Sequence, residues 1–241
     1  MPKYLLIQSR PEIEASDDEF RAFCKFGGLD EAQVERLQMH EVQPEVNLDD
    51  YTAVLMGGGP ANFAYDDDHK SVEQKSFEPW LFALLDEIVA QDKPFLGACL
   101  GLGALVTHSG GNMSFDYSEA VGAVEVNLTD SGSKDPMLVG VPGSFRAFVG
   151  HKEGAGSVPP HLTVLASNDS CIQMARIGMN IYATQFHPEL DPAGLELRIQ
   201  TYKHAGYFRP DEAEQLIADG WASDVGGFPT QVLRNFTNIY L

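Results

Sequence analysis

The chain has 241 residues, 44% of them hydrophobic, which is enough to bury a substantial core within one domain. Sixteen basic against 35 acidic residues give a net charge of −19, and such a surface disfavours unassisted binding to DNA or RNA. The apolar runs are too short to span a membrane, so we expect no membrane association, and we interpret the opening "MPKYLLIQSR" as a core strand rather than a signal peptide. The three cysteines have no CxxC spacing, which favours the reducing cytoplasm and argues against a cysteine-rich metal site.

The first half of the chain alternates short apolar runs with longer amphipathic segments. Hydrophobic periodicity predicts strands at 3–9, 41–43, 51–59 and 93–98, a helix over 16–39 interrupted at Gly27 and Gly28, and a helix over 76–92. This alternation is typical of a parallel sheet with helices on both faces.

After residue 111 the pattern changes to short strands separated by turn residues. We predict strands within 120–129, 145–150, 162–168, 171–178 and 180–188, the last two joined as a hairpin at 178–180. Beyond Pro192 the chain reads as helical again, over 194–208 and 210–223. We therefore divide the chain into residues 1–190 and a helical extension, residues 191–241, packed on the same domain.

The stretch "GACLG" places Cys99 between a strand and a helix, with glycines on both sides. A strand–turn–helix of this kind is typical of a nucleophile elbow, which exposes the central side chain at the carboxyl end of the sheet. The N-terminus of the following helix would favour the reactive thiolate. The alternative is that Cys99 is a small buried residue packed where strand meets helix.

A nucleophilic cysteine needs a base and a group that orients it. His187 ends an apolar strand in "YATQFHPEL", and Pro188 stops that strand. Residues two apart in an extended segment point to the same side, so Glu189 can reach the His187 ring. The alternative is a strand-end histidine beside a surface glutamate.

A third feature is the glycine turn in "VLMGGGPAN", whose backbone N–H groups could hold an oxyanion. By itself it is compatible with an ordinary tight turn. All three features follow strands of one α/β pattern, and this joint occurrence makes coincidence a poor explanation.

With "GGP", "GACLG" and "FHPE" in this order, residues 50–190 resemble the class I (triad-type) glutamine amidotransferases, in particular their stand-alone GMP-synthase-like members. The resemblance implies a cysteine nucleophile at Cys99, with His187 as its acid and base and Glu189 orienting His187. It further implies oxyanion donors at Gly59 and Leu100, with Gly58 and Gly103 beside the substrate. No metal or organic cofactor is implied.

The chain departs from the family at one site position. The elbow commonly continues GxCxGxQ, and its glutamine helps to form the substrate pocket, whereas this chain has Gly103 there. The triad is unaffected, but a pocket without that side chain could accept a different γ-glutamyl compound or bind glutamine weakly.

Other candidate residues have simpler interpretations. His151 lies in a segment that resembles a loop near the family's active-site mouth, and we expect it to be a surface histidine, with a binding role as the alternative. We expect His108 to lie too far along its helix to touch the thiol, and residues 66–69 to form a solvated loop rather than a metal site. Cys24 and Cys171 lack glycine turns and are expected to pack in the interior.

The resulting prediction is an α/β domain with a flavodoxin-like, largely parallel central sheet, flanking helices and a C-terminal helical extension. The predicted function is hydrolysis of L-glutamine to glutamate and ammonia. Because the chain has no GxxxxGK[ST] phosphate-binding motif, a separate synthetase would be the ammonia acceptor, as in a GMP-synthase-type amination. Two alternatives stay open: a γ-glutamyl hydrolase acting on another amide or peptide, and a catalytically weak regulatory or binding relative.

Overall fold

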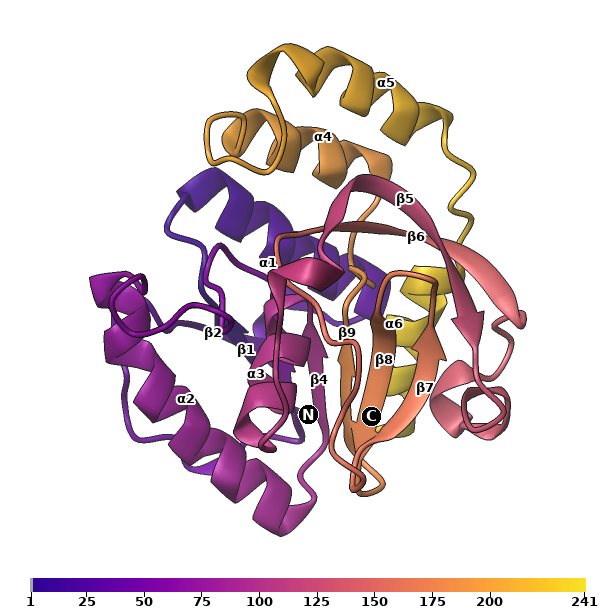
Figure 1. Cartoon of the computed structure of the whole chain (residues 1–241). Coiled ribbons are helices and arrows are strands. Elements are labelled where there is room, and N and C mark those ends of the chain that lie inside the picture. Colours follow the sequence, from indigo (N-terminus) through magenta and orange to yellow (C-terminus); the bar gives the residue numbers. More distant parts are fainter. Residues whose placement is uncertain (1) are drawn as a thin grey trace.

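The computed structural model describes residues 2–241, and within them nine strands form a single sheet flanked by helices (Figure 1). The strands are β1 (Tyr4–Gln8), β2 (Val34–Gln38), β3 (Ala53–Met56), β4 (Phe95–Ala98), β5 (Glu119–Leu128), β6 (Ser144–His151), β7 (Thr163–Ser167), β8 (Ile172–Ile177) and β9 (Ile181–Thr184). The helices are α1 (Ile13–Gly27), α2 (Val72–Gln91), α3 (Leu100–His108), α4 (Pro192–Thr201), α5 (Ala213–Ala222) and α6 (Phe228–Ile239).

The sheet has a parallel half and an antiparallel half, in the order β2-β1-β3-β4-β9-β8-β7-β5-β6. The first five strands are parallel and follow the flavodoxin-like order, whereas β8, β7, β5 and β6 pair antiparallel. The α/β prediction with a parallel centre is confirmed, and so is the β8–β9 hairpin. The antiparallel strands widen the sheet on the far side of β9.

Helices cover both faces of the parallel half because its strands are apolar on both sides. On one face, α2 and α3 pack against Leu5, Ile7, Val54 and Met56. On the other face, α1 and α6 pack against the alternate strand residues, among them Tyr4 and Leu6. The helix pair α4 and α5 lies over the β5–β6 end of the molecule, as Figure 1 shows, with Leu195 and Ile199 packing near Phe148.

Three local predictions were wrong. The helix expected over 16–39 ends at Gly27, where Gly28 adopts φ 67° and closes the helix, and residues 34–38 instead form the edge strand β2. Residues 41–43 form the end of a turn and an irregular segment rather than a strand. The helix expected to reach residue 208 ends at Thr201, which leaves residues 202–208 as a loop.

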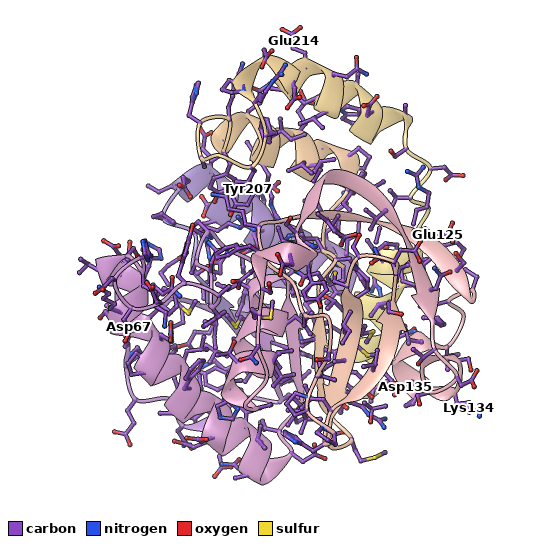
Figure 2. The ribbon with its side chains drawn as sticks, in the orientation of Figure 1. Asp67, Glu125, Lys134, Asp135, Tyr207 and Glu214 are labelled. Carbon is purple, nitrogen blue, oxygen red and sulfur yellow. The ribbon has the colours of Figure 1, made fainter. Side chains whose placement is uncertain are left out.

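No helix within residues 2–241 has the length and apolar character needed to cross a bilayer. Residues 66–69 form an exposed loop, and Asp67 lies at the edge of the molecule in Figure 2. The expectation of a solvated loop is therefore confirmed.

Candidate active site

Cys99 occupies a strained turn between β4 and α3. Its backbone has φ 51° and ψ −91°, a conformation that non-glycine residues rarely adopt. Its N–H donates to the Thr184 carbonyl at 2.7 Å, which ties the elbow to the end of β9. The side chain is partly exposed, unlike those of Cys24 and Cys171, which are buried as expected.

The end of β9 brings His187 and Glu189 to the same place. His187 Nδ1 lies 2.8 Å from Glu189 Oε1, and both side chains are buried. The His187 N–H donates to the Phe148 carbonyl at 3.0 Å, which fixes the backbone between β9 and β6. His187 and Cys99 line one cavity of about 50 Å³. The three residues predicted as a triad therefore converge.

Charge interactions determine the protonation states of His187 and Glu189. Burial alone would lower the pKa of His187, but the Glu189 carboxylate and the neighbouring Cys99 thiol outweigh it and raise the pKa to about 9. Burial would raise the pKa of Glu189, yet the charges of His187 and Arg198 hold it well below its usual range. At neutral pH the arrangement therefore favours an imidazolium hydrogen-bonded to a carboxylate.

The glycine turn after β3 supplies a possible oxyanion site. Among the hydrogen bonds of residues 2–241, none uses the N–H of Gly59 or of Leu100, so both can donate to a substrate oxygen. The Gly58 N–H is already engaged, because it donates to Glu19 Oε1 at 3.2 Å. Gly58 has a steric role instead, since a Cβ there would lie 2.7 Å from His187 Cε1.

A chain of buried charges lies behind His187, and the sequence patterns did not reveal it. Arg198 Nη1 donates to Glu189 Oε1 at 3.0 Å, and Arg198 Nη2 lies 3.8 Å from Glu19 Oε1. Arg10 Nε donates to the same Glu19 oxygen at 3.0 Å, and Arg10 Nη1 donates to the Tyr202 hydroxyl. One sequence signal was available for Arg10. It follows β1 as Cys99 follows β4, and the carboxyl ends of these parallel strands lie at the same end of the sheet.

Two pockets meet at Cys99. The polar pocket is lined by Gly59, Asn62, Leu100, Gln185, Glu153 and their neighbours, and Gln185 Nε2 lies 3.8 Å from Cys99 Sγ. The apolar pocket is lined by His187 and Arg10 together with Val121, Val149, Leu190, Leu195, Ile199 and Phe208. Tyr207 lines both, and Figure 2 shows it between α4 and the sheet.

The space beside Gly103 is taken by other groups. A Cβ at position 103 would lie 3.0 Å from Phe63 Cδ2 and 3.3 Å from Glu153 Oε1. The buried Glu153 carboxylate accepts hydrogen bonds from the Phe63 N–H at 2.8 Å and the Ala64 N–H at 2.6 Å. Glu153 thus holds the loop that follows the glycine turn, in the region where the family carries its glutamine side chain.

The surface position expected for His151 was wrong: its side chain is buried. His151 Nε2 lies 2.9 Å from Glu119 Oε2, and Nδ1 lies 2.7 Å from the Glu153 carbonyl. Glu119, His151 and Cys171 present possible ligand atoms within 4.8 Å of one another. Glu119 also accepts hydrogen bonds from Gln173 and Asn168, so internal bonds satisfy this cluster without an ion. His108 faces Asp86 on α2, away from the thiol, as expected.

Comparison with known proteins identifies the family. The model of the glutamine amidotransferase class-I family matches residues 20–199. The chain belongs to this family. It is 30% identical over 148 residues to one subunit of a glutamine-hydrolyzing GMP synthase from Methanosphaera stadtmanae, covering 60% of this chain and 69% of that one.

Longer relatives share only part of their length with this chain. It is 31% identical over 143 residues to a glutamine-hydrolyzing GMP synthase from Elusimicrobium minutum, covering 58% of this chain but 25% of that protein. The chain therefore spans about a quarter of the full-length synthases it matches. A glutamine amidotransferase structure from Thermotoga maritima superimposes with a TM-score of 0.75 at 21% identity, covering 100% of this chain and 98% of the other, which supports the fold.

Proposed function

We propose that this chain hydrolyses the side-chain amide of L-glutamine to glutamate and ammonia through a thioester on Cys99. The observation that carries the proposal is the convergence of Cys99 with the buried His187–Glu189 pair in a class I amidotransferase domain. Amides are poor electrophiles, and this set supplies a thiolate, a proton donor and an oxyanion site together.

In the first half-reaction the Cys99 thiolate attacks the amide carbon, and the N–H groups of Gly59 and Leu100 bind the resulting oxyanion. The C–N bond then breaks as His187 gives its proton to the departing ammonia, which leaves a γ-glutamyl thioester. In the second half-reaction His187 takes a proton from water, which attacks the thioester carbon. The C–S bond breaks, and glutamate and the thiolate are restored.

Glu189 and Arg198 would act through His187. The Glu189 carboxylate orients the ring through Nδ1 and stabilises its protonated form. Arg198 shares the same carboxylate oxygen, so it limits how far Glu189 can move. We treat Arg198 as a positioning residue.

We further propose that a separate synthetase receives the ammonia, by analogy with the relatives named as individual subunits of GMP synthase. We also place the protein in the cytoplasm, because a reducing compartment keeps Cys99 as a free thiol. Co-elution with candidate synthetases on a sizing column tests the partnership, and absence of co-elution at micromolar concentrations would count against it.

The decisive experiment measures glutamate release from L-glutamine by the wild-type chain and by Cys99→Ser. We expect the variant to lose activity by roughly 10³-fold or more, while Cys24→Ser, a change at a buried cysteine on α1, keeps it. Equal release by wild type and Cys99→Ser would refute the proposal. If Cys99 were also no more sensitive to alkylation than Cys24 and Cys171, the regulatory or binding role would be favoured.

A further inference from the structure

The apolar pocket has the position required for the leaving group of the reaction. The group that departs from the γ-carbon receives its proton from His187, so it must lie on the His187 side of Cys99. His187 lines only the apolar pocket and Leu100 lines only the polar pocket, while Gly59 and Cys99 line both. The acyl half of the substrate therefore belongs in the polar pocket and the leaving half in the apolar one.

Ammonia does not account for the lining of this pocket. Val121, Val149, Leu190, Leu195, Ile199 and Phe208 give it aliphatic and aromatic walls. Such walls stabilise a bound apolar group by removing it from water, whereas a small polar molecule like ammonia needs only the polar groups of the pocket, among them His187, Arg198 and Tyr202. The lining fits an amine that carries an aliphatic side chain.

Two cations line the same pocket, Arg10 and Arg198, and Arg198 is paired with Glu189 at 3.0 Å. Arg10 is about 5% exposed, and its Nε and Nη1 are bonded to Glu19 and Tyr202. Its remaining terminal nitrogen, Nη2, lies near the glycine turn, where a Cβ on Gly58 would be 2.8 Å away. Within residues 2–241 this nitrogen has no hydrogen-bond partner, so the guanidinium can donate to a carboxylate on the leaving amine beside the reacting centre.

We propose that the same site hydrolyses γ-glutamyl dipeptides whose second residue is an aliphatic amino acid. This inference rests on the proposed thioester chemistry and names a further substrate class for it. The γ-glutamyl C–N bond breaks, the departing amino acid takes its proton from His187, and water completes the hydrolysis to glutamate. The aliphatic side chain packs between Val121 and Ile199, and the α-carboxylate pairs with Arg10.

The test compares kcat/KM for L-glutamine, γ-glutamyl-leucine, and the γ-glutamyl amide of 3-methylbutylamine, which keeps the aliphatic body and lacks the carboxylate. We expect γ-glutamyl-leucine to exceed glutamine by roughly tenfold or more, because binding removes its aliphatic side chain from water. We expect it to exceed the carboxylate-free amide by a further factor of about ten.

A substitution in the apolar pocket tests whether this pocket causes the preference for γ-glutamyl-leucine over glutamine. Val121→Trp fills part of it and should lower the ratio of kcat/KM for γ-glutamyl-leucine over glutamine by roughly fivefold or more. Val121 is only partly buried on β5, so the larger side chain has room to avoid the core. Val139→Trp, at a position 67% exposed and outside the pocket, should leave the ratio unchanged.

The possible outcomes separate this inference from the proposed function. A preference for glutamine over γ-glutamyl-leucine overturns the inference and leaves glutamine hydrolysis standing. Cys99-dependent cleavage of γ-glutamyl-leucine without glutamine hydrolysis supports the inference and overturns the proposed function. Equal rates for the dipeptide and the carboxylate-free amide overturn the role of Arg10, and failure to cleave any of the three substrates overturns both proposals.

Discussion

On the His187 side of Cys99, four charged side chains are buried together, whereas on the opposite side Glu153 bonds to backbone N–H groups. Arg10, Glu19, Glu189 and Arg198 form the charged group, and none is more than about 7% exposed. Removing one member leaves another buried charge without compensation, which is costly. Loss of a hydrogen bond at Glu153 leaves only an unpaired N–H, which costs less. The comparison indicates that the His187 side of the site, the acid–base side, tolerates substitution less than the Glu153 side, the acyl side.

The largest effect is expected for Glu189→Gln. It should lower kcat on the order of 10²–10⁴-fold, because the His187 ring loses its anionic partner. It should also lower the free energy of unfolding by about 3–5 kcal/mol, because Arg198 loses its carboxylate. Steady-state kinetics and urea denaturation measure the two quantities. Glu14→Gln, the same change on the exposed side of α1, is the control and should alter neither.

The protonation of His187 should make stability depend on pH. Its pKa is raised from 6.5 to about 9 in the folded protein, so its contribution is complete below pH 6.5 and is lost as pH rises towards 9. We expect this loss to be about 3 kcal/mol. Urea denaturation at pH 6.5, 7.5 and 9 should show the decline, and His187→Gln should flatten it. An unchanged slope in that variant would contradict the assignment.

On the acyl side, Gly103→Gln introduces the residue typical of the family. Because Phe63 and Glu153 already fill that space, we expect a loss of about 1–3 kcal/mol in the free energy of unfolding and a higher KM for glutamine. Gly101→Ala is the matched control on α3, since its Cβ would meet nothing closer than 3.9 Å. That control should be neutral or slightly stabilising. A Gly103→Gln variant as stable as wild type would show that the loop containing Phe63 moves aside at little energetic cost.

The smallest effect is expected for Glu153→Gln. The amide retains one acceptor oxygen, so only one of the two backbone N–H groups loses its partner. We expect a loss of about 1–2 kcal/mol in the free energy of unfolding and a severalfold increase in KM without a matching fall in kcat. An effect on kcat as large as that of Glu189→Gln would remove the distinction between the two sides.

The parts predicted from sequence were those that depend on local backbone chemistry. The glycines around Cys99 and the short spacing of His187 and Glu189 each act within a few residues, so the sequence itself shows them. The Arg10–Glu19–Arg198 group joins the segment after β1 to α1 and α4, and no local pattern specifies which charges meet across the fold. The same limit explains His151, because only the pairing of β5 with β6 places Glu119 opposite it.

The mispredicted segments show where tertiary context overrides periodicity. Residues 34–38 form a strand because they pair in parallel with β1, although their buried residues, Val34 and Leu37, are three apart and continue the apolar spacing of a helix. The loop at 202–208 is likewise determined by contacts with residues distant in the sequence. Lys152 Nζ donates to the Ala205 carbonyl there and lies 4.5 Å from the centre of the Tyr207 ring, contacts that no property of the 194–208 segment alone predicts.

The backbone strain at Cys99 also has an evolutionary consequence. A residue held at φ 51° with a Cβ costs the native state on the order of 1–3 kcal/mol, and glycine at that position would relieve it. Replacement of Cys99 by glycine would therefore stabilise the fold while removing the nucleophile. In a descendant no longer under selection for catalysis, a single codon change would give a more stable protein with the same fold and no catalytic activity.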